Sequence, residues 1–155
     1  MKPITIRQAV LDDLEDLAPL FDRYRVFQGK PSDVVAARDF LRARLDHGES
    51  VVFVAQDGNS SIGFAQLYPS YSSVALARVF VLNDLFVDAA GRRKGVASAL
   101  LAAVERYAWS LGAVRITLNV ATENTAGQAL YEACGWRADA QYTMYHRFPD
   151  HSQSA

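Results

Sequence analysis

The sequence has a single cysteine, Cys134, among its 155 residues. One cysteine cannot form an intramolecular disulfide, which excludes the small extracellular domains that depend on such bridges. The first residues also lack the apolar segment of a secretory signal peptide. Both absences are typical of a protein from a reducing compartment, so we expect a cytoplasmic location.

An excess of charge of one sign is also missing, as are long apolar runs. The 16 lysine and arginine residues are balanced by 17 aspartate and glutamate residues, and the net charge is −1. This balance argues against a general nucleic-acid-binding protein. No apolar run approaches the roughly 20 residues that span a bilayer. We therefore expect neither a nucleic acid nor a membrane as partner, and the spacing of the histidines predicts no metal site.

The length and composition are those of an ordinary globular domain. Half of the residues are hydrophobic and 21% are charged, as in typical soluble folds. A chain of this length can bury a substantial core. We interpret residues 1–148 as a single domain and the polar residues 149–155 as a disordered tail.

Hydrophobic periodicity and turn residues predict alternating helices and strands. Strands are expected over residues 4–7, 51–55, 62–68, 78–87 and 114–120, and a last one within 138–148. Helices are expected over the segments 12–28, 33–48, 93–111 and 125–134. The tripeptide Asp57-Gly58-Asn59 predicts a hairpin turn, and the serine- and tyrosine-rich segment 69–74 predicts a loop.

The most informative segment is the cationic run Arg92-Arg93-Lys94-Gly95-Val96-Ala97. It follows an apolar strand and opens a helix. The first turn of a helix has N–H groups without intrahelical partners, and its dipole favours negative charge. A glycine at this position lets a phosphate approach the backbone closely. The segment therefore predicts a binding site for a diphosphate group.

Two common phosphate loops do not fit this segment. A dinucleotide-binding fingerprint would have three glycines near the start of a βαβ unit, whereas this loop has only Gly95 and lies past the middle of the chain. A P-loop would continue with Gly-Lys-Ser or Gly-Lys-Thr, but Gly95 is followed by Val96. The diphosphate must therefore belong to another kind of ligand.

The pattern R-x-x-G-x-A after Leu85-Phe86-Val87 resembles the coenzyme A loop of the GNAT N-acetyltransferases. A second stretch, from Asn124 to Trp136, resembles that family's N…A..LY…GF motif, with Trp136 where phenylalanine is common. The resemblance implies an α/β fold with a mixed, splayed sheet of six to seven strands and four flanking helices. It also implies acetyl-coenzyme A as cosubstrate, no metal and a homodimer.

The resemblance further implies which residues bind the cosubstrate. Backbone groups of the strand before the loop would pair with the pantetheine arm, the loop would bind the diphosphate, and the start of a later helix would reach the other side of the pantetheine. The residues implied are Leu85, Phe86, Val87, Arg92, Arg93, Lys94, Gly95, Val96, Ala97, Ser98, Asn124 and Gly127.

Tyr131 is the candidate general acid, because the family has its tyrosine seven residues after the asparagine that corresponds to Asn124. A phenol has a reference pKa near 10 and is protonated at neutral pH, so it can donate a proton to the departing thiolate. The alternative is that Tyr131 is a packed aromatic residue whose hydroxyl bonds to the backbone. The motif favours catalysis.

Asn83 and Asp84 interrupt a strand that is otherwise apolar. One interpretation is a β-bulge whose polar side chains bond to nearby backbone. The other is an acceptor site, in which Asp84 attracts an ammonium group and takes its proton, directly or through water. The two interpretations are compatible. Tyr24 and Phe27, at the end of the first helix, lie where the family builds its acceptor wall.

The segment L-N-D-L-F-V resembles that of the spermidine/spermine acetyltransferases and of yeast histone- and polyamine-acetylating relatives, with Asn83 in place of an acid. We therefore predict an N-acetyltransferase that acts on a primary amine of a small molecule, such as a polyamine or an amino acid. Two alternatives stay open, which are a protein-lysine acetyltransferase and a non-catalytic coenzyme A-binding sensor module.

Overall fold

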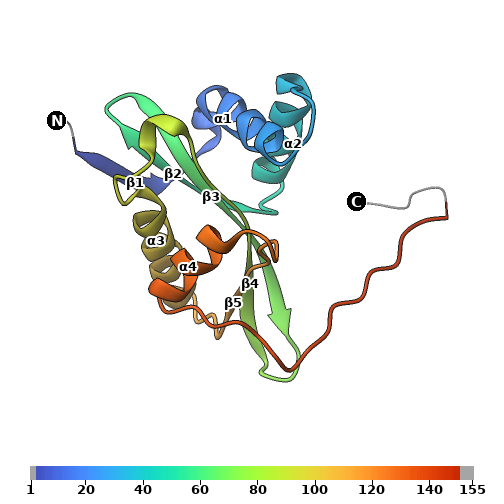
Figure 1. Cartoon of the computed structure of the whole chain (residues 1–155). Helices are drawn as coiled ribbons and strands as arrows, with labels where there is room; N and C mark the ends of the chain where they lie inside the picture. Colours follow the sequence, from blue (N-terminus) through green and yellow to red (C-terminus); the bar gives the residue numbers. More distant parts are fainter. Residues whose placement is uncertain (1–2, 151–155) are drawn as a thin grey trace. The chain divides into compact units, whose positions relative to one another are not determined.

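The computed structural model describes residues 3–150, which fall into two compact units, one ending at Ala121 and one beginning at Thr122 (Figure 1). In the first unit the strands are β1 (Ile4–Gln8), β2 (Val51–Asp57), β3 (Ser60–Ser72), β4 (Ala77–Val87) and β5 (Ile116–Thr117). Its α-helices are α1 (Leu14–Phe27), α2 (Val34–Asp46) and α3 (Val96–Ser110), with short 3₁₀ turns at Leu11–Asp13 and Ala89–Gly91. The second unit has α4 (Thr125–Ala133).

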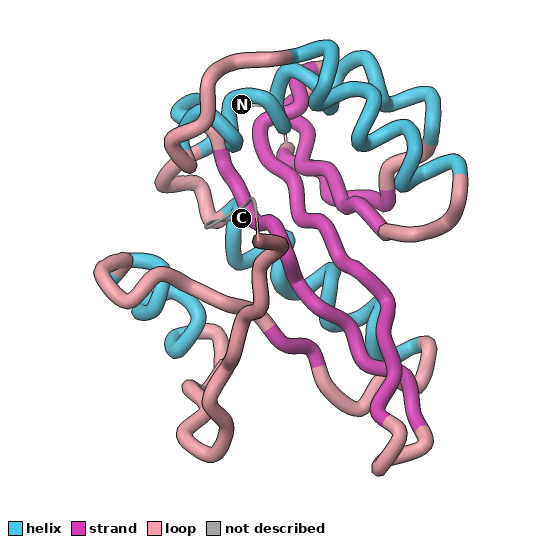
Figure 2. Tube along the Cα trace, turned by 90° about the vertical axis from the view of Figure 1, so that its right-hand side faces the viewer, coloured by secondary structure: helices cyan, strands magenta, loops and turns pink. Residues whose placement is uncertain are grey.

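The strands of the first unit form one mixed sheet in the order β1-β2-β3-β4-β5, visible as neighbouring tubes in Figure 2. The pairs β1/β2, β2/β3 and β3/β4 are antiparallel, and β5 is parallel to β4. The hairpin turn expected at Asp57-Gly58-Asn59 joins β2 to β3, and Gly58 has the positive φ of 61° that such turns favour. The predicted α/β class with a mixed sheet and four helices is confirmed.

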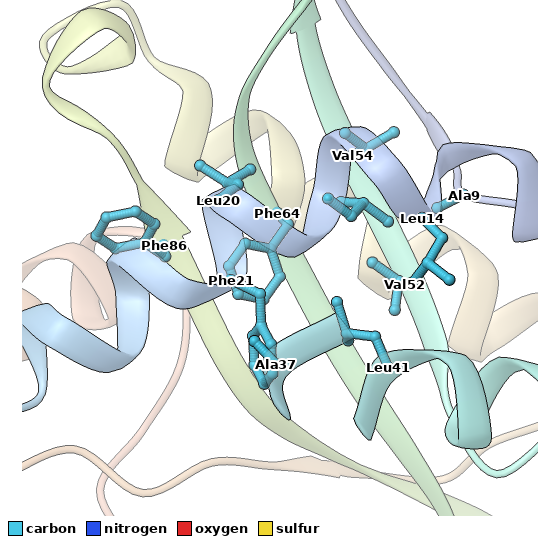
Figure 3. Close-up of a cluster of buried hydrophobic side chains, with 11 residues drawn as sticks. Ala9, Leu14, Leu20, Phe21, Ala37, Leu41, Val52, Val54, Phe64 and Phe86 are labelled. Carbon is cyan, nitrogen blue, oxygen red and sulfur yellow. The ribbon is translucent and has the colours of Figure 1, made fainter. Parts of the chain in front are cut away.

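Helices cover both faces of this sheet. On one face, Leu14, Leu20 and Phe21 of α1 lie in one buried cluster with Ala37 and Leu41 of α2 and with residues of β2, β3 and β4, as the close-up in Figure 3 shows. On the other face, Tyr107 of α3 packs edge-on against Phe53, at 5.5 Å between ring centroids. Because strand side chains alternate between faces, β2 can serve both layers. The sheet is therefore the central layer of this unit, with helices packed on both of its faces.

Asp22 joins the first two helices. It is only 5% exposed and accepts hydrogen bonds from the Ser32 hydroxyl and the Asp33 N–H, both at 2.7 Å. Asp33 in turn caps α2 by accepting from the Ala36 N–H. Asp33 is therefore the residue that caps α2, while the neighbouring Ser32 bonds to Asp22.

The loop predicted over residues 69–74 is wrong, because β3 continues to Ser72 and the turn lies at residues 73–76. Strand β2 pairs with β3 only as far as Leu67, so Pro69 lies where β3 has a partner on one side alone. Proline is tolerated at such an edge. Arg78 adds a cross-strand contact by placing its guanidinium 5.2 Å from the Tyr71 ring centroid.

The sheet is smaller than expected, with five strands among the described residues instead of six or seven. The strand expected over 114–120 is reduced to Ile116–Thr117, which pairs only with Phe80 and Val81 of β4. From Leu82 onward, this side of β4 has no strand partner in the described part of the chain. The sheet therefore opens along β4, as the predicted splay requires.

The second unit contains no strand within residues 122–150. The prediction of a strand within 138–148 is thus wrong. Apolar and polar residues alternate there, but the segment makes no backbone pairing with another described strand. Tyr142 and Tyr145 are exposed. Of the tail predicted to be disordered, 149–155, residues 151–155 lie outside the described part. None of the described helices is long and apolar enough to cross a membrane.

Candidate functional site

The cationic loop lies between β4 and α3. Helix α3 begins at Val96 and not at Arg93 as expected, because Arg93 and Gly95 both have left-handed backbone conformations, with φ of 63° and 73°. Gly95 is the residue that precedes the helix, and a Cβ built on it would meet nothing within 4 Å. The backbone that leads into α3 is therefore open to solvent at Gly95, so an anionic ligand can approach the start of the helix.

The three cations of the loop have different surroundings. Arg92 donates from Nε to the Val87 carbonyl at 3.3 Å and lies 5.9 Å above the Phe27 ring. Lys94 pairs with Asp57 across 3.8 Å. All three cationic side chains are exposed. Arg92 is thus held against the sheet, while the positive charge of the loop faces solvent, where a diphosphate can reach it.

A glycine-to-aspartate change at position 95 tests this loop. We expect Gly95→Asp to retain the fold and to lower acetyl-coenzyme A affinity at least tenfold, because a carboxylate would face the phosphates; each ~1.4 kcal/mol of repulsion is a factor of ten. Gly95→Asn is the matched control, since asparagine has the same shape, tolerates a left-handed backbone and carries no charge. Calorimetric titration of both variants gives the comparison, and equal affinities would exclude a diphosphate at this loop.

The strand before the loop offers backbone groups on its open side. Leu85, Phe86 and Val87 pair with β3 on one side, and on the other side they have no strand partner among residues 3–150. Strand backbones expose N–H and C=O groups toward both neighbours, so an unpaired edge can bond an extended ligand. The predicted role of these three residues toward the pantetheine arm stays a prediction, and the open edge fits it.

The bulge expected at Asn83-Asp84 is confirmed. Gln66 of β3 is opposite Asp84, whereas the next residue, Leu67, is opposite Leu82, so Asn83 is the extra residue of β4. The polar side chains bond to one another and not to backbone. Gln66 Nε2 donates to Asp84 Oδ2 at 2.7 Å, and Asn83 Nδ2 donates to Asp84 Oδ1 at 3.1 Å.

Asp84 is a buried carboxyl group with an altered proton affinity. It is 5% exposed, and burial raises its pKa above the ordinary aspartate value, while hydrogen bonds from Gln66, Tyr24 and Asn83 partly oppose this rise. Burial favours the neutral form because the charged form loses hydration. Perturbed groups of this kind are typical of functional sites. Asp84 is therefore a stronger base than an exposed aspartate.

The structure brings the four predicted acceptor residues close to one another. Tyr24, on α1, bonds to Asp84 and packs 5.7 Å from Phe86. Phe27, one turn further on, is 67% exposed and lies 6.0 Å from the same ring. Together with Asn83 and Asp84 they place aromatic rings close to a buried carboxyl group, a combination that suits an organic cation.

Sequence reasoning missed Gln66. It is fully buried, at 0% exposure, in the middle of β3. The available signal was a lone polar residue within the apolar run from Ile62 to Tyr68, on the strand that directly precedes Asn83-Asp84 in the chain and pairs with it as a hairpin. A buried polar group needs a partner, and Asp84 is that partner.

The second unit places Asn124 and Gly127 at the start of α4. Asn124 is the N-cap, and its Oδ1 accepts from the Gly127 N–H at 2.9 Å. A Cβ on Gly127 would lie 2.7 Å from the Asn124 amide nitrogen, so a larger residue there would displace the capping side chain. Both residues thus have a structural role, and their predicted contact with the pantetheine stays a prediction.

Tyr131 lies on α4 and is half-buried. The centroid of its ring is 6.1 Å from that of the Trp136 ring, and its backbone carbonyl accepts a hydrogen bond from the backbone N–H of Trp136 at 2.9 Å. Burial raises the pKa of the Tyr131 phenol above its ordinary value. A phenol with a raised pKa stays protonated at neutral pH, as a general acid must. This fits the predicted role of Tyr131, which stays a prediction.

Comparison with known proteins matches this architecture to a family. Residues 13–136 match the Acetyltransferase (GNAT) family model. An N-acetyltransferase of Bacillus subtilis, YhfO, which is uncharacterized, is 42% identical over 142 residues, covering 92% of this chain and 95% of its own length. The chain belongs to the GNAT acetyltransferase family, and it is an acyltransferase.

Two further similarities bear on the ligand. A crystal structure described as that of a probable acetyltransferase superposes with a TM-score of 0.89 at 39% identity, covering 94% of this chain and 98% of the other. An aminoglycoside N-acetyltransferase solved in complex with CoA has a TM-score of 0.77 at 25% identity, covering 95% and 96%. Coenzyme A binding by such relatives is consistent with acetyl-coenzyme A as cosubstrate here.

Proposed function

We propose that this N-acetyltransferase transfers an acetyl group from acetyl-coenzyme A to a primary amine of a small, cationic molecule by direct attack. The observation that carries the proposal is the buried Asp84, held at a β-bulge beside aromatic side chains of α1. A carboxylate there can attract an ammonium group and accept its proton. The aromatic rings can pack against the alkyl part of the same molecule.

The proposed chemistry divides among a few side chains. The loop from Arg92 to Ser98 holds the diphosphate, and bound acetyl-coenzyme A supplies an activated thioester carbonyl. Asp84 takes the proton of the acceptor amine so that its lone pair is free to attack. Since Asp84 is only 5% exposed, the proton passes through the Tyr24 hydroxyl or one water. Tyr131 donates a proton to the leaving sulfur.

The substrate class is supported by two relatives. An aminoglycoside N(6')-acetyltransferase of Salmonella typhimurium is 28% identical over 128 residues, covering 81% of this chain and 87% of its own length. A related structure, 26% identical, holds a bisubstrate analog of coenzyme A and acetylneamine. Both concern amines with several cationic groups. A polyamine, as the L-N-D-L-F-V segment suggested, belongs to the same chemical class.

A panel of acceptors tests this proposal. We expect thiol release from acetyl-coenzyme A with polyamines or aminoglycosides, at kcat/KM values at least roughly tenfold above those of a lysine-containing peptide, because one well-placed ionic contact contributes on that scale. Preference for the peptide would favour a protein-lysine acetyltransferase. Binding of acetyl-coenzyme A without release with any amine would favour a sensor module. A homodimer and a cytoplasmic location, both expected from the sequence, stay predictions.

A further inference from the structure

In the side-chain amide of Gln66, the nitrogen makes a hydrogen bond and the oxygen makes none with the described residues. Its Nε2 donates to Asp84 Oδ2 at 2.7 Å. Its Oε1 is buried, and no donor among the described residues lies within hydrogen-bonding distance of it. An unsatisfied buried polar atom costs about 1–3 kcal/mol. Such a cost at the centre of a strand indicates that the amide has a task that an apolar residue could not perform.

The arrangement suits both protonation states of the neighbouring carboxyl group. An amide carries a donor and an acceptor at its two ends, and its terminal torsion has two broad, nearly equivalent orientations. In the orientation observed, Gln66 donates to a carboxylate. After a half-turn, Oε1 would stand where Nε2 stands now and could accept from a carboxylic acid. Either orientation leaves one end without a partner, so the turn carries little net cost.

We propose that Gln66 is a positioning residue for the proton acceptor, which bonds to the Asp84 carboxylate before proton transfer and, by turning its amide, to the Asp84 carboxylic acid afterwards. In this step the N–H bond of the acceptor ammonium breaks, an O–H bond forms on Asp84, and Gln66 exchanges a donated for an accepted hydrogen bond. The inference rests on the proposed function of Asp84 as the base.

Other groups also face Asp84, and they define the background for a pH test. Tyr24 of α1 and Asn83 of β4 donate hydrogen bonds to it. Tyr68 of β3 has a pKa raised by burial first and then by the charge of Asp84, while Arg44 of α2 opposes that rise. These groups stay unchanged in the Gln66 variants. A shift in the acid limb, which is the low-pH side of the plot of kcat/KM against pH, therefore reports the Gln66–Asp84 hydrogen bond.

Two substitutions separate positioning from structure. Gln66→Met keeps the volume and removes the donor to the carboxylate, so the acid limb of kcat/KM should move up by about one to two pH units. Gln66→Glu places a second carboxyl group against Asp84, and the limb should move further because two such groups share one proton. Gln56→Met, on the neighbouring strand β2, is the matched control and should leave the limb in place.

The wild-type protein gives an independent measurement that needs no variant. The side-chain amide ¹⁵N resonance of Gln66 should titrate with pH at the midpoint of the acid limb. A resonance that is flat across the limb, or a limb that stays in place in folded Gln66→Met, overturns the inference. If instead the resonance titrates but Asp84→Asn retains full turnover, the inference about the bond stands and the proposed catalytic role of Asp84 is wrong.

Discussion

Tyr131→Phe should lower turnover by roughly the 10²–10⁴ that general acid–base catalysis contributes, while acetyl-coenzyme A still binds. The substitution keeps the ring that packs 6.1 Å from Trp136 and removes only the hydroxyl. The phenol has a pKa raised by burial, so it is protonated at neutral pH and can donate to the leaving sulfur. Without the donor, the thiolate must leave unprotonated, which raises the barrier.

Steady-state rates and calorimetric affinities on the same preparations give the measurement. Tyr142→Phe is the matched control, because Tyr142 belongs to the same unit, is 82% exposed and has no proposed role. It should retain wild-type turnover. If Tyr131→Phe also turns over at the wild-type rate when chemistry is rate-limiting, Tyr131 is a packing residue and the proton must come from elsewhere.

Asp84→Asn should cause a large fall in kcat/KM for amine acceptors at neutral pH, with little change in acetyl-coenzyme A affinity. The amide cannot attract an ammonium group or accept its proton, yet it can still accept from the Gln66 amide at the position observed. Activity should recover in part at higher pH, because more of the acceptor is then free amine. The measurement is kcat/KM against pH for both proteins.

Asp22→Asn is the control for Asp84→Asn. Asp22 and Asp84 are each 5% exposed, but hydrogen bonds from Ser32 and from the Asp33 N–H lower the pKa of Asp22. Asp22→Asn should therefore reduce the melting temperature with little effect on kcat/KM. If Asp84→Asn behaves in the same way, destabilised but fully active, then Asp84 is a structural part of the bulge.

The two aspartates should also have opposite effects on stability as pH changes. The folded-state pKa of Asp84 is raised, so the folded protein binds this proton more tightly than the unfolded chain. Its contribution to stability is present at low pH and is lost as pH rises through the folded pKa. Asp84→Asn should thus gain stability relative to wild type over that window. For Asp22, whose pKa is lowered, the contribution is instead lost as pH falls.

Much of the fold could be predicted from the sequence because its signals are local. The helix at Asp33, the hairpin at Gly58 and the bulge at Asn83 each depend on residues close together in the chain. The prediction of a loop over residues 69–74 is wrong because serine is common in loops, whereas pairing with the long strand β4 extends β3 to Ser72. Pairing between distant segments overrides local preference.

The residues of the acceptor site could be predicted only in part, for the same reason. Asp84 stood out as a charged residue in an apolar strand, and Tyr24 by its place in the family pattern. Gln66 did not, because its importance comes from a cross-strand pairing that the bulge shifts by one residue. The helix start was placed three residues early, since the left-handed conformation of Arg93 has no signal in sequence.

The central claim is direct acetyl transfer to a small amine, and product stoichiometry tests it most directly. The wild-type protein is incubated with acetyl-coenzyme A and the best acceptor of the panel, and both free thiol and N-acetylated amine are quantified by mass spectrometry. The account predicts one acetylated amine for each thiol released, with no acetyl group on the protein. Thiol release without acetylated amine, or acetyl groups retained on the protein, would contradict it.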